Sequence, residues 1–317
     1  MNFLIISNKS ALIVCKNTDR TSYSGISNRI RDLEHFIDSL GFVVEFLEPG
    51  KQINSSYYDL ICISSFVNAR HLKGLKAKTN YLWIDSMDSW KLTRRSFFFD
   101  NPFKEAIKFL RDLAGSRMMK FADLITYCST RDAEFDGQNQ LNILIFSPTQ
   151  ESRQAGLLDF GKRFVFVGPS EYLPNRDGLN YLYSMAEEGI FDKTNLHVYG
   201  SQTKYNRSHP KIIIHGEASK TELYGKQDVH LVPIWKGAGI KYKTLMPLSQ
   251  GIRVISSLEG ANGINKTENL KIGVDKKSFK DLVINENWSN QPFKETANLL
   301  ALDQKAHIAK RIYSKMK

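Results

Sequence analysis

The sequence predicts an α/β protein with two domains, each built around a parallel sheet. Short apolar runs that suit buried strands alternate with stretches whose apolar residues recur at helical spacing. This alternation occupies both halves of the chain, and the polar stretch at residues 148–161, which lacks strong periodicity, separates them as a linker. A length of 317 residues accommodates two domains of ordinary size.

The first half opens with a predicted strand at residues 3–7, followed by a second apolar run at residues 11–15. An amphipathic helix comes next and should end at Gly41, because its apolar residues keep helical spacing up to that glycine: Ile26, Ile30, Leu33, Phe36, Ile37 and Leu40. Further strands are expected at residues 43–47, 60–63, 81–84 and 141–146. The order of strand, loop, helix and strand is the opening of a Rossmann-like domain.

A basic and aromatic stretch follows, at residues 90–120. It contains Arg94 and Arg95 beside a run of three phenylalanines at residues 97–99, and then a predicted helix over residues 102–120. The apolar positions of this helix share one face, which ordinary packing explains: Phe103, Ile107, Leu110, Leu113 and Ala114. The phenylalanines beside the arginines leave an alternative open, in which this stretch meets a membrane surface or a lipid acceptor.

The second half repeats the alternation. A strand at residues 163–167 runs into Gly168 and Ser170 and then a helix, and a strand at residues 196–199 follows. Another strand, at residues 212–214, precedes His215, Gly216 and Glu217, and a short helix is expected at residues 221–225. The end of the chain should hold helices at residues 279–283 and 293–316, the last strongly basic.

The most informative run is residues 230–257. A strand at residues 231–234 leads to Gly237, Ala238 and Gly239, then to a helix at residues 242–249, a turn at Gly251 and a strand at residues 254–255. Ligands of open parallel sheets bind at the loops that leave the carboxyl ends of strands. Glycine N–H groups approach an anion closely, and Lys241 and Lys243 add cations at the helix start, so the pattern suits a diphosphate. The alternative is an ordinary glycine loop with solvated lysines.

This run resembles the donor-site segment of family 4 type glycosyltransferases, retaining enzymes of the GT-B fold found in bacterial surface-polysaccharide synthesis. The glycines, Lys241, Lys243, Gly251 and the strand at residues 254–255 fall in register with that family. Residues 165–175 give a second match in the right order. The chain departs from the family at Met246 and Ala238, where acidic residues are usual.

The resemblance implies a GT-B fold with an acceptor-side domain at residues 1–150, a nucleotide-sugar-binding domain at residues 162–300 and a basic helix at residues 301–317. It implies a nucleoside-diphosphate sugar as donor, a glycan or lipid-linked acceptor, and neither a metal nor a separate cofactor. The donor phosphates would meet Gly25, Gly168, Ser170, Gly237, Ala238, Gly239, Lys241 and Lys243. The nucleobase would meet His215, Gly216 and Glu217, although His215 also suits a structural or surface role.

The resemblance also suggests the catalytic groups. Lys243 would stabilise the charge on the departing diphosphate. At the end of the strand over residues 81–84, Asp88, and as second choice Asp85, would orient or deprotonate an acceptor hydroxyl. An equally simple reading is that an Asp or Ser before Trp90 caps the next helix.

The net charge of +11 favours an anionic partner: a nucleotide sugar, an anionic membrane surface or a nucleic acid. Nucleic acid is the weakest of the three, because the basic residues are scattered and form no recognised motif. Three well-separated cysteines suit reduced thiols, no apolar run approaches a membrane span, and the first residues suit a strand better than a signal peptide. We therefore expect a cytoplasmic protein, with peripheral attachment to the inner face of the cell membrane as an alternative.

Two other functions remain open. A non-catalytic GT-B subunit that binds a partner transferase or a glycan would account for Met246 and Ala238. A nucleotide-sugar epimerase of similar architecture would need an acid and a base around the sugar, and the sequence identifies neither.

Overall fold

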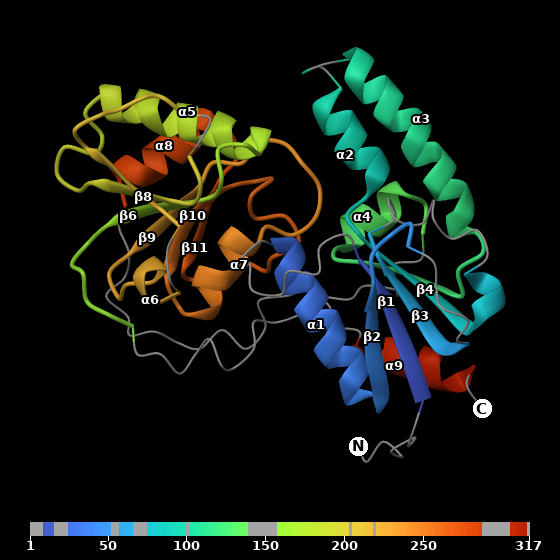
Figure 1. The fold of residues 1–317 in the computed structure, drawn as a ribbon. Coiled ribbons are helices and arrows are strands. Elements are labelled where there is room, and N and C mark those ends of the chain that lie inside the picture. The colour runs from blue at the N-terminus through green and yellow to red at the C-terminus, as the bar shows by residue number, and fades with distance from the viewer. Residues whose placement is uncertain are drawn as a thin grey trace. The chain divides into compact units, whose positions relative to one another are not determined.

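The computed structural model describes residues 9–15, 25–51, 57–65, 75–98, 100, 102–138, 157–202, 205–217, 220–286 and 305–315. The chain divides into two compact units: Met1–Phe146 with Leu302–Lys317, and Ser147–Ala301 (Figure 1). The strands expected at residues 3–7 and 141–146 and most of the expected linker lie outside the described residues. The predicted α/β fold is confirmed, because each unit is built on a parallel sheet.

In the described part of the first unit, five parallel strands lie in the order β2-β1-β3-β4-β5. Their bounds are Lys9–Val14 for β1, Phe42–Leu47 for β2, Tyr58–Ser64 for β3, Thr79–Met87 for β4 and Leu124–Tyr127 for β5. A short 3-10 helix, Lys76–Lys78, precedes β4. The central strands β1, β3 and β4 are buried almost throughout, as expected for parallel strands covered on both faces.

Two helices from opposite ends of the chain cover one face of this sheet. The predicted amphipathic helix is confirmed as α1, Gly25–Ser39, and Gly41 follows it with φ +84°, a conformation that favours glycine. The carboxyl-terminal helix α9, Lys305–Ser314, buries Ile308, Ala309 and Ile312 in the same core. The Tyr313 hydroxyl donates to the Leu40 carbonyl at 2.9 Å, which ties α9 to the end of α1.

The helices after β4 are α2, Trp90–Phe97, α3, Pro102–Met119, and α4, Thr130–Phe135. α3 matches the predicted range closely, but the predicted interior packing of its apolar face is wrong. Phe103, Ile107 and Leu110 are 79%, 56% and 67% exposed, whereas the acidic Glu105 and Asp112 are buried. The reason is an ion-pair network with α2, in which Arg94 binds both acids.

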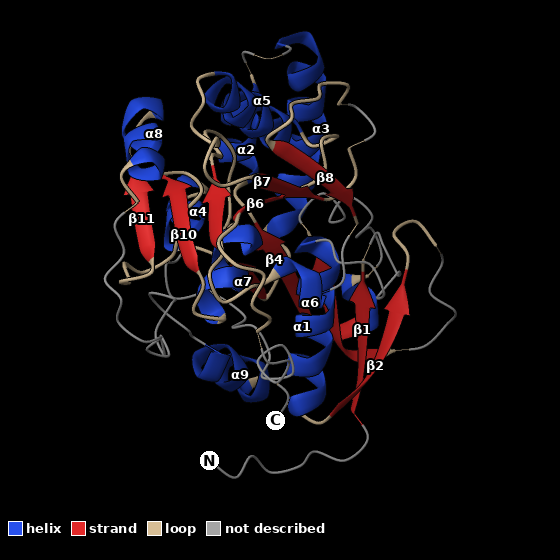
Figure 2. Cartoon of the chain, turned by 90° about the vertical axis from the view of Figure 1, so that its left-hand side faces the viewer, coloured by secondary structure: helices blue, strands red, loops and turns tan. Residues whose placement is uncertain are grey.

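In the described part of the second unit, six parallel strands lie in the order β11-β10-β9-β6-β7-β8. Their bounds are Phe164–Val167 for β6, Leu196–Tyr199 for β7, Ile212–Gly216 for β8, Val229–Val232 for β9, Arg253–Ser257 for β10 and Leu270–Gly273 for β11. Figure 2 shows β10 and β11 side by side with their arrowheads in the same direction. β11 was not predicted, and β9 begins two residues before the expected strand.

Helices cover both faces of the second sheet (Figure 1). α5, Leu173–Glu187, and α8, Lys276–Ile284, bury Leu179, Leu182, Phe279 and Val283 against one face. α7, Tyr242–Ser249, buries Leu245 and Leu248 against the other, and the short α6, Lys220–Leu223, precedes β9. Both faces of the β6 and β9 strands are therefore closed, and the carboxyl ends of the strands are where side chains can meet a ligand. Among the described residues, no helix is long and apolar enough to cross a membrane.

Candidate functional site at the carboxyl ends of the second sheet

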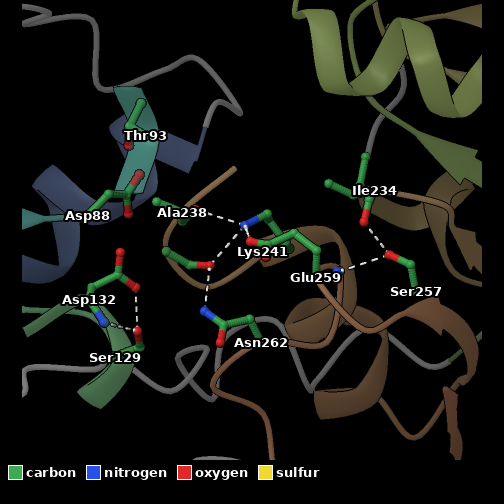
Figure 3. Close-up of polar contacts among 12 residues, drawn as sticks. Asp88, Thr93, Ser129, Asp132, Ile234, Ala238, Lys241, Ser257, Glu259 and Asn262 are labelled. Carbon is green, nitrogen blue, oxygen red and sulfur yellow. Dashed lines mark hydrogen bonds and ion pairs between the residues drawn. The ribbon is translucent and has the colours of Figure 1, made fainter. Parts of the chain in front are cut away.

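The glycine loop connects β9 to α7 as predicted. Gly237 and Gly239 have φ of +139° and +73°, conformations that favour glycine, and Lys241 is the N-cap residue of α7. The loop is anchored from β10, because the Ser257 hydroxyl donates to the Ile234 carbonyl (Figure 3). On α7, the buried Thr244 hydroxyl donates to the Gly260 carbonyl at 2.7 Å. The segment at the end of β10 therefore holds both the start of the glycine loop and the helix that follows it.

Lys241 is turned inward, against its own loop. Its ammonium donates to the carbonyls of Ala238 at 2.8 Å and Gly239 at 2.9 Å, and it lies 3.2 Å from a carboxylate oxygen of Glu259 (Figure 3). The side chains of Lys241 and Glu259 are only 10% and 12% exposed. Sequence reasoning missed Glu259, whose signal is an acidic residue two positions after the strand that follows the glycine loop. This ion pair holds the loop in its shape.

Lys243 lies on the first turn of α7 and reaches toward β6. Its ammonium donates to the Asn175 side-chain oxygen and lies 5.3 Å from the centre of the Phe166 ring. Burial, together with the nearby positive charge of Lys241, lowers the pKa of Lys243 to about 7. A lysine with such a pKa gains most from an incoming anion, which would restore its charged form.

The loop and β6 meet at the start of α5. A Cβ built on Gly237 would lie 3.5 Å from the Lys241 ammonium and 3.8 Å from the Tyr172 hydroxyl, and Tyr172 is the N-cap residue of α5. Asn175, the partner of Lys243, lies on the first turn of the same helix. The structure therefore brings both lysines and the glycine loop together with the start of α5, as the phosphate-site prediction requires.

Three neighbouring strands end in glycines with positive φ. Gly168, Gly200 and Gly216 follow or end β6, β7 and β8 with φ of +157°, +111° and +73°. The Gly200 amide donates to the Gly216 carbonyl at 2.6 Å, which joins two of these turns. Because neighbouring strands lie about 4.8 Å apart, the β6 and β8 ends are separated by roughly 10 Å. The edge therefore spans a distance longer than a phosphate group, and the Gln202 side chain bridges part of it by donating to the Gly168 and Gly200 carbonyls.

The predicted base-binding residues lie at the β8 end of this edge. The His215 ring stacks on Tyr199 with 4.4 Å between ring centres and on His197 with 5.0 Å. Burial lowers the pKa of His197 to about 4 and, with the nearby Arg163, lowers the pKa of His215, so both rings are neutral at pH 7. Glu217 is exposed, and a Cβ on Gly216 would meet nothing within 4 Å. A flat, neutral surface beside open backbone suits a nucleobase.

Two other residues predicted to bind the donor phosphates, Ser170 and Gly25, lie on segments other than the glycine loop. Ser170 is 1% exposed and its amide donates to the Ser201 carbonyl at 2.9 Å, so its side chain belongs to the interior of the turn after β6. A direct contact of this side chain with a ligand does not fit that burial. Gly25, expected to meet the donor phosphates, is the first residue of α1 in the first unit.

Of the two aspartates at the end of β4, Asp85 is completely buried. Its carboxylate accepts from the Arg29 guanidinium at 2.9 and 2.6 Å and from the Thr126 hydroxyl at 2.7 Å. The prediction that Asp85 acts on an acceptor hydroxyl does not fit this arrangement, because its oxygens are engaged and closed off from solvent. The bidentate pair instead joins α1 to β4.

Asp88 is exposed at the same strand end (Figure 3). The preceding Met87 has φ +62°, a conformation rare outside glycine, after a register shift between Asp85 and Met87. The helix cap is Ser89, whose side chain accepts from the Leu92 amide, while its own amide donates to Asp132 at 2.7 Å. The cap role falls to Ser89, and the exposed Asp88 carboxylate accepts from the Cys128 thiol at 3.5 Å. It lies on a strained turn of the kind that marks functional sites.

No model of a known protein family matches this sequence, and no curated protein sequence matches it. Solved structures do match. UDP-GlcNAc 2-epimerase from Methanocaldococcus jannaschii aligns with a TM-score of 0.52 at 8% identity, over 97% of this chain and 99% of that chain. The chain has the GT-B fold.

Two further solved structures align at lower TM-scores. An α,α-trehalose-phosphate synthase from Burkholderia xenovorans aligns with a TM-score of 0.48 at 11% identity, over 94% of this chain and 79% of that chain. The glycosyltransferase of kitacinnamycin aligns with a TM-score of 0.47 at 10% identity, over 98% of this chain and 94% of that chain. In the GT-B fold, the two units described above are the two Rossmann-like domains.

Proposed function

We propose that the protein is a glycosyltransferase that uses a nucleoside-diphosphate sugar as donor. The observation that carries this proposal is the inward placement of Lys241 and Lys243 at the glycine loop, beside the start of α5. Two half-buried ammonium groups beside a glycine loop suit two linked phosphates. The neutral His215 and Tyr199 stack lies at the other end of the same sheet edge and suits the base of the nucleotide. The archaeal epimerase that shares the fold was determined with UDP-GlcNAc and UDP, which supports a nucleotide sugar as ligand.

In the proposed reaction, the bond between the sugar C1 and the diphosphate oxygen breaks, and a bond from C1 to an acceptor oxygen forms. Protonated Lys243 stabilises the negative charge that develops on the departing diphosphate. Lys241 contributes indirectly, because its bonds to Ala238 and Gly239 set the course of the loop. Asp88 orients the acceptor hydroxyl and takes its proton.

The finer assignments rest on the family resemblance. They are retention at the anomeric carbon, a hexose donor, a glycan or lipid-linked acceptor, a role in polysaccharide synthesis and a cytoplasmic location. Among the described residues, no group of three or more His, Cys, Asp or Glu side chains is arranged to hold a metal ion. We propose that Lys243 and the N–H groups of the glycine loop, which Lys241 holds in shape, offset the charge of the diphosphate.

The test is incubation with a panel of UDP-, GDP-, ADP- and dTDP-sugars, with mass spectrometry of the products. We expect one donor to be hydrolysed slowly, with release of nucleoside diphosphate and free sugar, and Lys243→Met to stop this release. Lys280→Met is the matched control, because Lys280 is a helical lysine of the same unit paired with Glu188 on the surface. The control should hydrolyse the donor at the wild-type rate.

Three results would contradict the proposal. An epimerised nucleotide sugar without nucleotide release would assign the protein as an epimerase. Donor binding in calorimetry without turnover in the presence of acceptors would support the non-catalytic subunit. Equal donor affinity of the wild type and Lys243→Met would remove the assigned phosphate site.

A further inference from the structure

Helix α3 presents its apolar side outward and its acidic side inward. Phe103, Ile107 and Leu110 recur at helical spacing and are 79%, 56% and 67% exposed. We call these three residues the outer ridge. Glu105 and Asp112, on the opposite side of the helix, are 5% and 1% exposed. This orientation is the reverse of a helix that packs on a hydrophobic core.

The network with α2 explains why α3 keeps this orientation. Arg94 of α2 donates one guanidinium nitrogen to Glu105 and another to Asp112, both at 2.6 Å, and Arg94 is itself only 14% exposed. Turning α3 about its axis to bury the outer ridge would break these charge-assisted bonds and leave Arg94 buried without them, which is strongly unfavourable. The exposure of the outer ridge is therefore built into the fold.

The exposed charges of α3 beside the outer ridge are positive, and the exposed Asp100 lies just before the helix. Lys104, Arg111 and Arg117 are exposed on α3, although Arg111 also pairs with Asp112 at 3.1 Å. Lys120 follows the helix with its ammonium 5.0 Å from the ring centre of the half-exposed Phe121. Both acidic residues of α3 are turned inward, and α2 has none. Figure 1 shows α2 and α3 as a helical hairpin, with α3 the longer helix. An apolar strip flanked by exposed cations complements a surface that is apolar beneath a negatively charged layer.

We propose that the outer ridge of α3 docks on the surface of an anionic lipid bilayer. Its three side chains enter the boundary between headgroups and acyl chains, while the flanking cations meet lipid phosphates. From Phe103 to Leu110 the ridge spans roughly 10 Å of helix, since the rise is about 1.5 Å per residue. The surface of three side chains is smaller than the roughly 800 Å² of surface that each partner buries in a stable protein interface, so the ridge suits a lipid surface better than a protein partner. The inference goes beyond sugar transfer and does not depend on it.

The test is flotation of the full chain with two kinds of vesicles, phosphatidylcholine alone and phosphatidylcholine mixed with phosphatidylglycerol. We expect binding to the mixed vesicles, little binding to phosphatidylcholine alone, and release by high salt. Ile107→Glu should weaken binding about tenfold or more, because it places a charge in the inserted strip. Ile284→Glu is the matched control, since Ile284 is a helical isoleucine that is 54% exposed in the second unit, and it should bind as the wild type does.

Both substitutions replace exposed side chains, so both variants should keep the wild-type melting temperature. Absence of binding to the mixed vesicles would overturn the proposal, as would equal binding by Ile107→Glu and Ile284→Glu. A wild-type dimer in light scattering without lipid, dispersed by Ile107→Glu, would show that a second copy of the chain covers the ridge and would also overturn it. The readout is vesicle binding alone, so failure of the proposed sugar transfer leaves this test unaffected.

Discussion

The ammonium of Lys243 occupies the space that a side chain on Gly168 would need. A Cβ built on Gly168 would lie 2.6 Å from Lys243 Nζ and 2.6 Å from Asn175 Nδ2. Gly168 also has φ +157°, at the edge of the region that favours glycine. The glycine after β6 is thus what allows a lysine from α7 to reach the start of α5.

Gly168→Ala tests this relationship. The methyl group would displace Lys243 and Asn175, so we expect a loss of nucleotide affinity of about tenfold or more and a loss of stability on the order of 1–3 kcal/mol. Gly161→Ala is the control, because Gly161 has φ +69° and open space around its Cβ position. It should show only the backbone cost of about 1 kcal/mol and normal nucleotide affinity. Calorimetric titration with nucleoside diphosphates and thermal denaturation measure both effects.

Lys243→Met should separate stability from binding. The pKa of Lys243 is about 7 in the folded protein and 10.5 in its reference state, so the unfolded chain binds more protons between those values. The wild type therefore becomes more stable as the pH rises from about 7 to 10.5, and below pH 7 it carries the full cost of the buried charge. We expect Lys243→Met to be more stable than the wild type at pH 6, by on the order of 1–3 kcal/mol, and to lose nucleotide affinity. Denaturant unfolding at pH 6 and 9 checks this, and a variant less stable than the wild type at pH 6 would contradict it.

Nucleotide binding should take up protons above pH 7. A bound diphosphate favours charged Lys243 and raises its pKa from about 7, so the affinity should fall as the pH rises from 7 to 9. Calorimetry at pH 8 in buffers of different ionisation enthalpy measures the proton uptake. Lys243→Met should show none of it. Uptake that persists in this variant would assign the proton to another group.

Asp85→Asn should reduce the stability of the protein, whereas Asp88→Asn should reduce the rate of transfer. Asp85→Asn leaves Arg29 buried without its carboxylate partner, so we expect a loss of stability of about 3–5 kcal/mol. Asp88→Asn changes an exposed carboxylate and should leave the melting temperature nearly unchanged while slowing transfer to the acceptor about a hundredfold or more. Transfer rates and thermal denaturation of both variants distinguish the roles, and normal transfer by Asp88→Asn would exclude it as the base.

Glu259→Gln should loosen the glycine loop. The change removes the negative charge beside the Lys241 ammonium but keeps a side chain of similar size with one acceptor oxygen, so the ion pair is reduced to a hydrogen bond with a neutral acceptor. We expect weaker nucleotide binding, by about three- to tenfold, with a small loss of stability of about 1 kcal/mol. Glu188→Gln, on the exposed pair with Lys280, is the control and should bind as the wild type does. Equal affinities in the two variants would remove the role assigned to Glu259.

Local patterns in the sequence are sufficient to predict the elements that bury one apolar face. α1 follows from six apolar residues at helical spacing, and α7 with β10 follows from the glycine loop and the turn at Gly251. β9 begins two residues earlier than predicted because the polar His230 is buried within the strand, with its ring Nε2 3.1 Å from the Leu223 carbonyl. Just before the strand, Asp228 pairs with Arg163, 65 residues away. A buried ion pair of that separation leaves no local pattern.

The same limit explains why the sequence did not predict the orientation of α3 or two of the residues that contact the lysines of the site. Apolar periodicity predicts that the apolar face is the inner one, but Arg94, outside α3, reverses this by binding Glu105 and Asp112. In the site, spacing predicts Lys241 and Lys243 correctly as part of the glycine loop and the helix start. Their partners Glu259 and Asn175 are 18 and 68 residues away, so only the folded sheet brings them together.

The docking of α9 on the first sheet has a consequence for biosynthesis. Ile308, Ala309 and Ile312 complete a core whose other members lie between Ala11 and Leu124, so this core stays open until the ribosome has passed residue 312. The second unit, Ser147–Ala301, is by then fully synthesised and free to fold. Nascent chains halted before α9 should therefore hold a protease-resistant second unit and a protease-sensitive first one, so that the half made first is the last to mature.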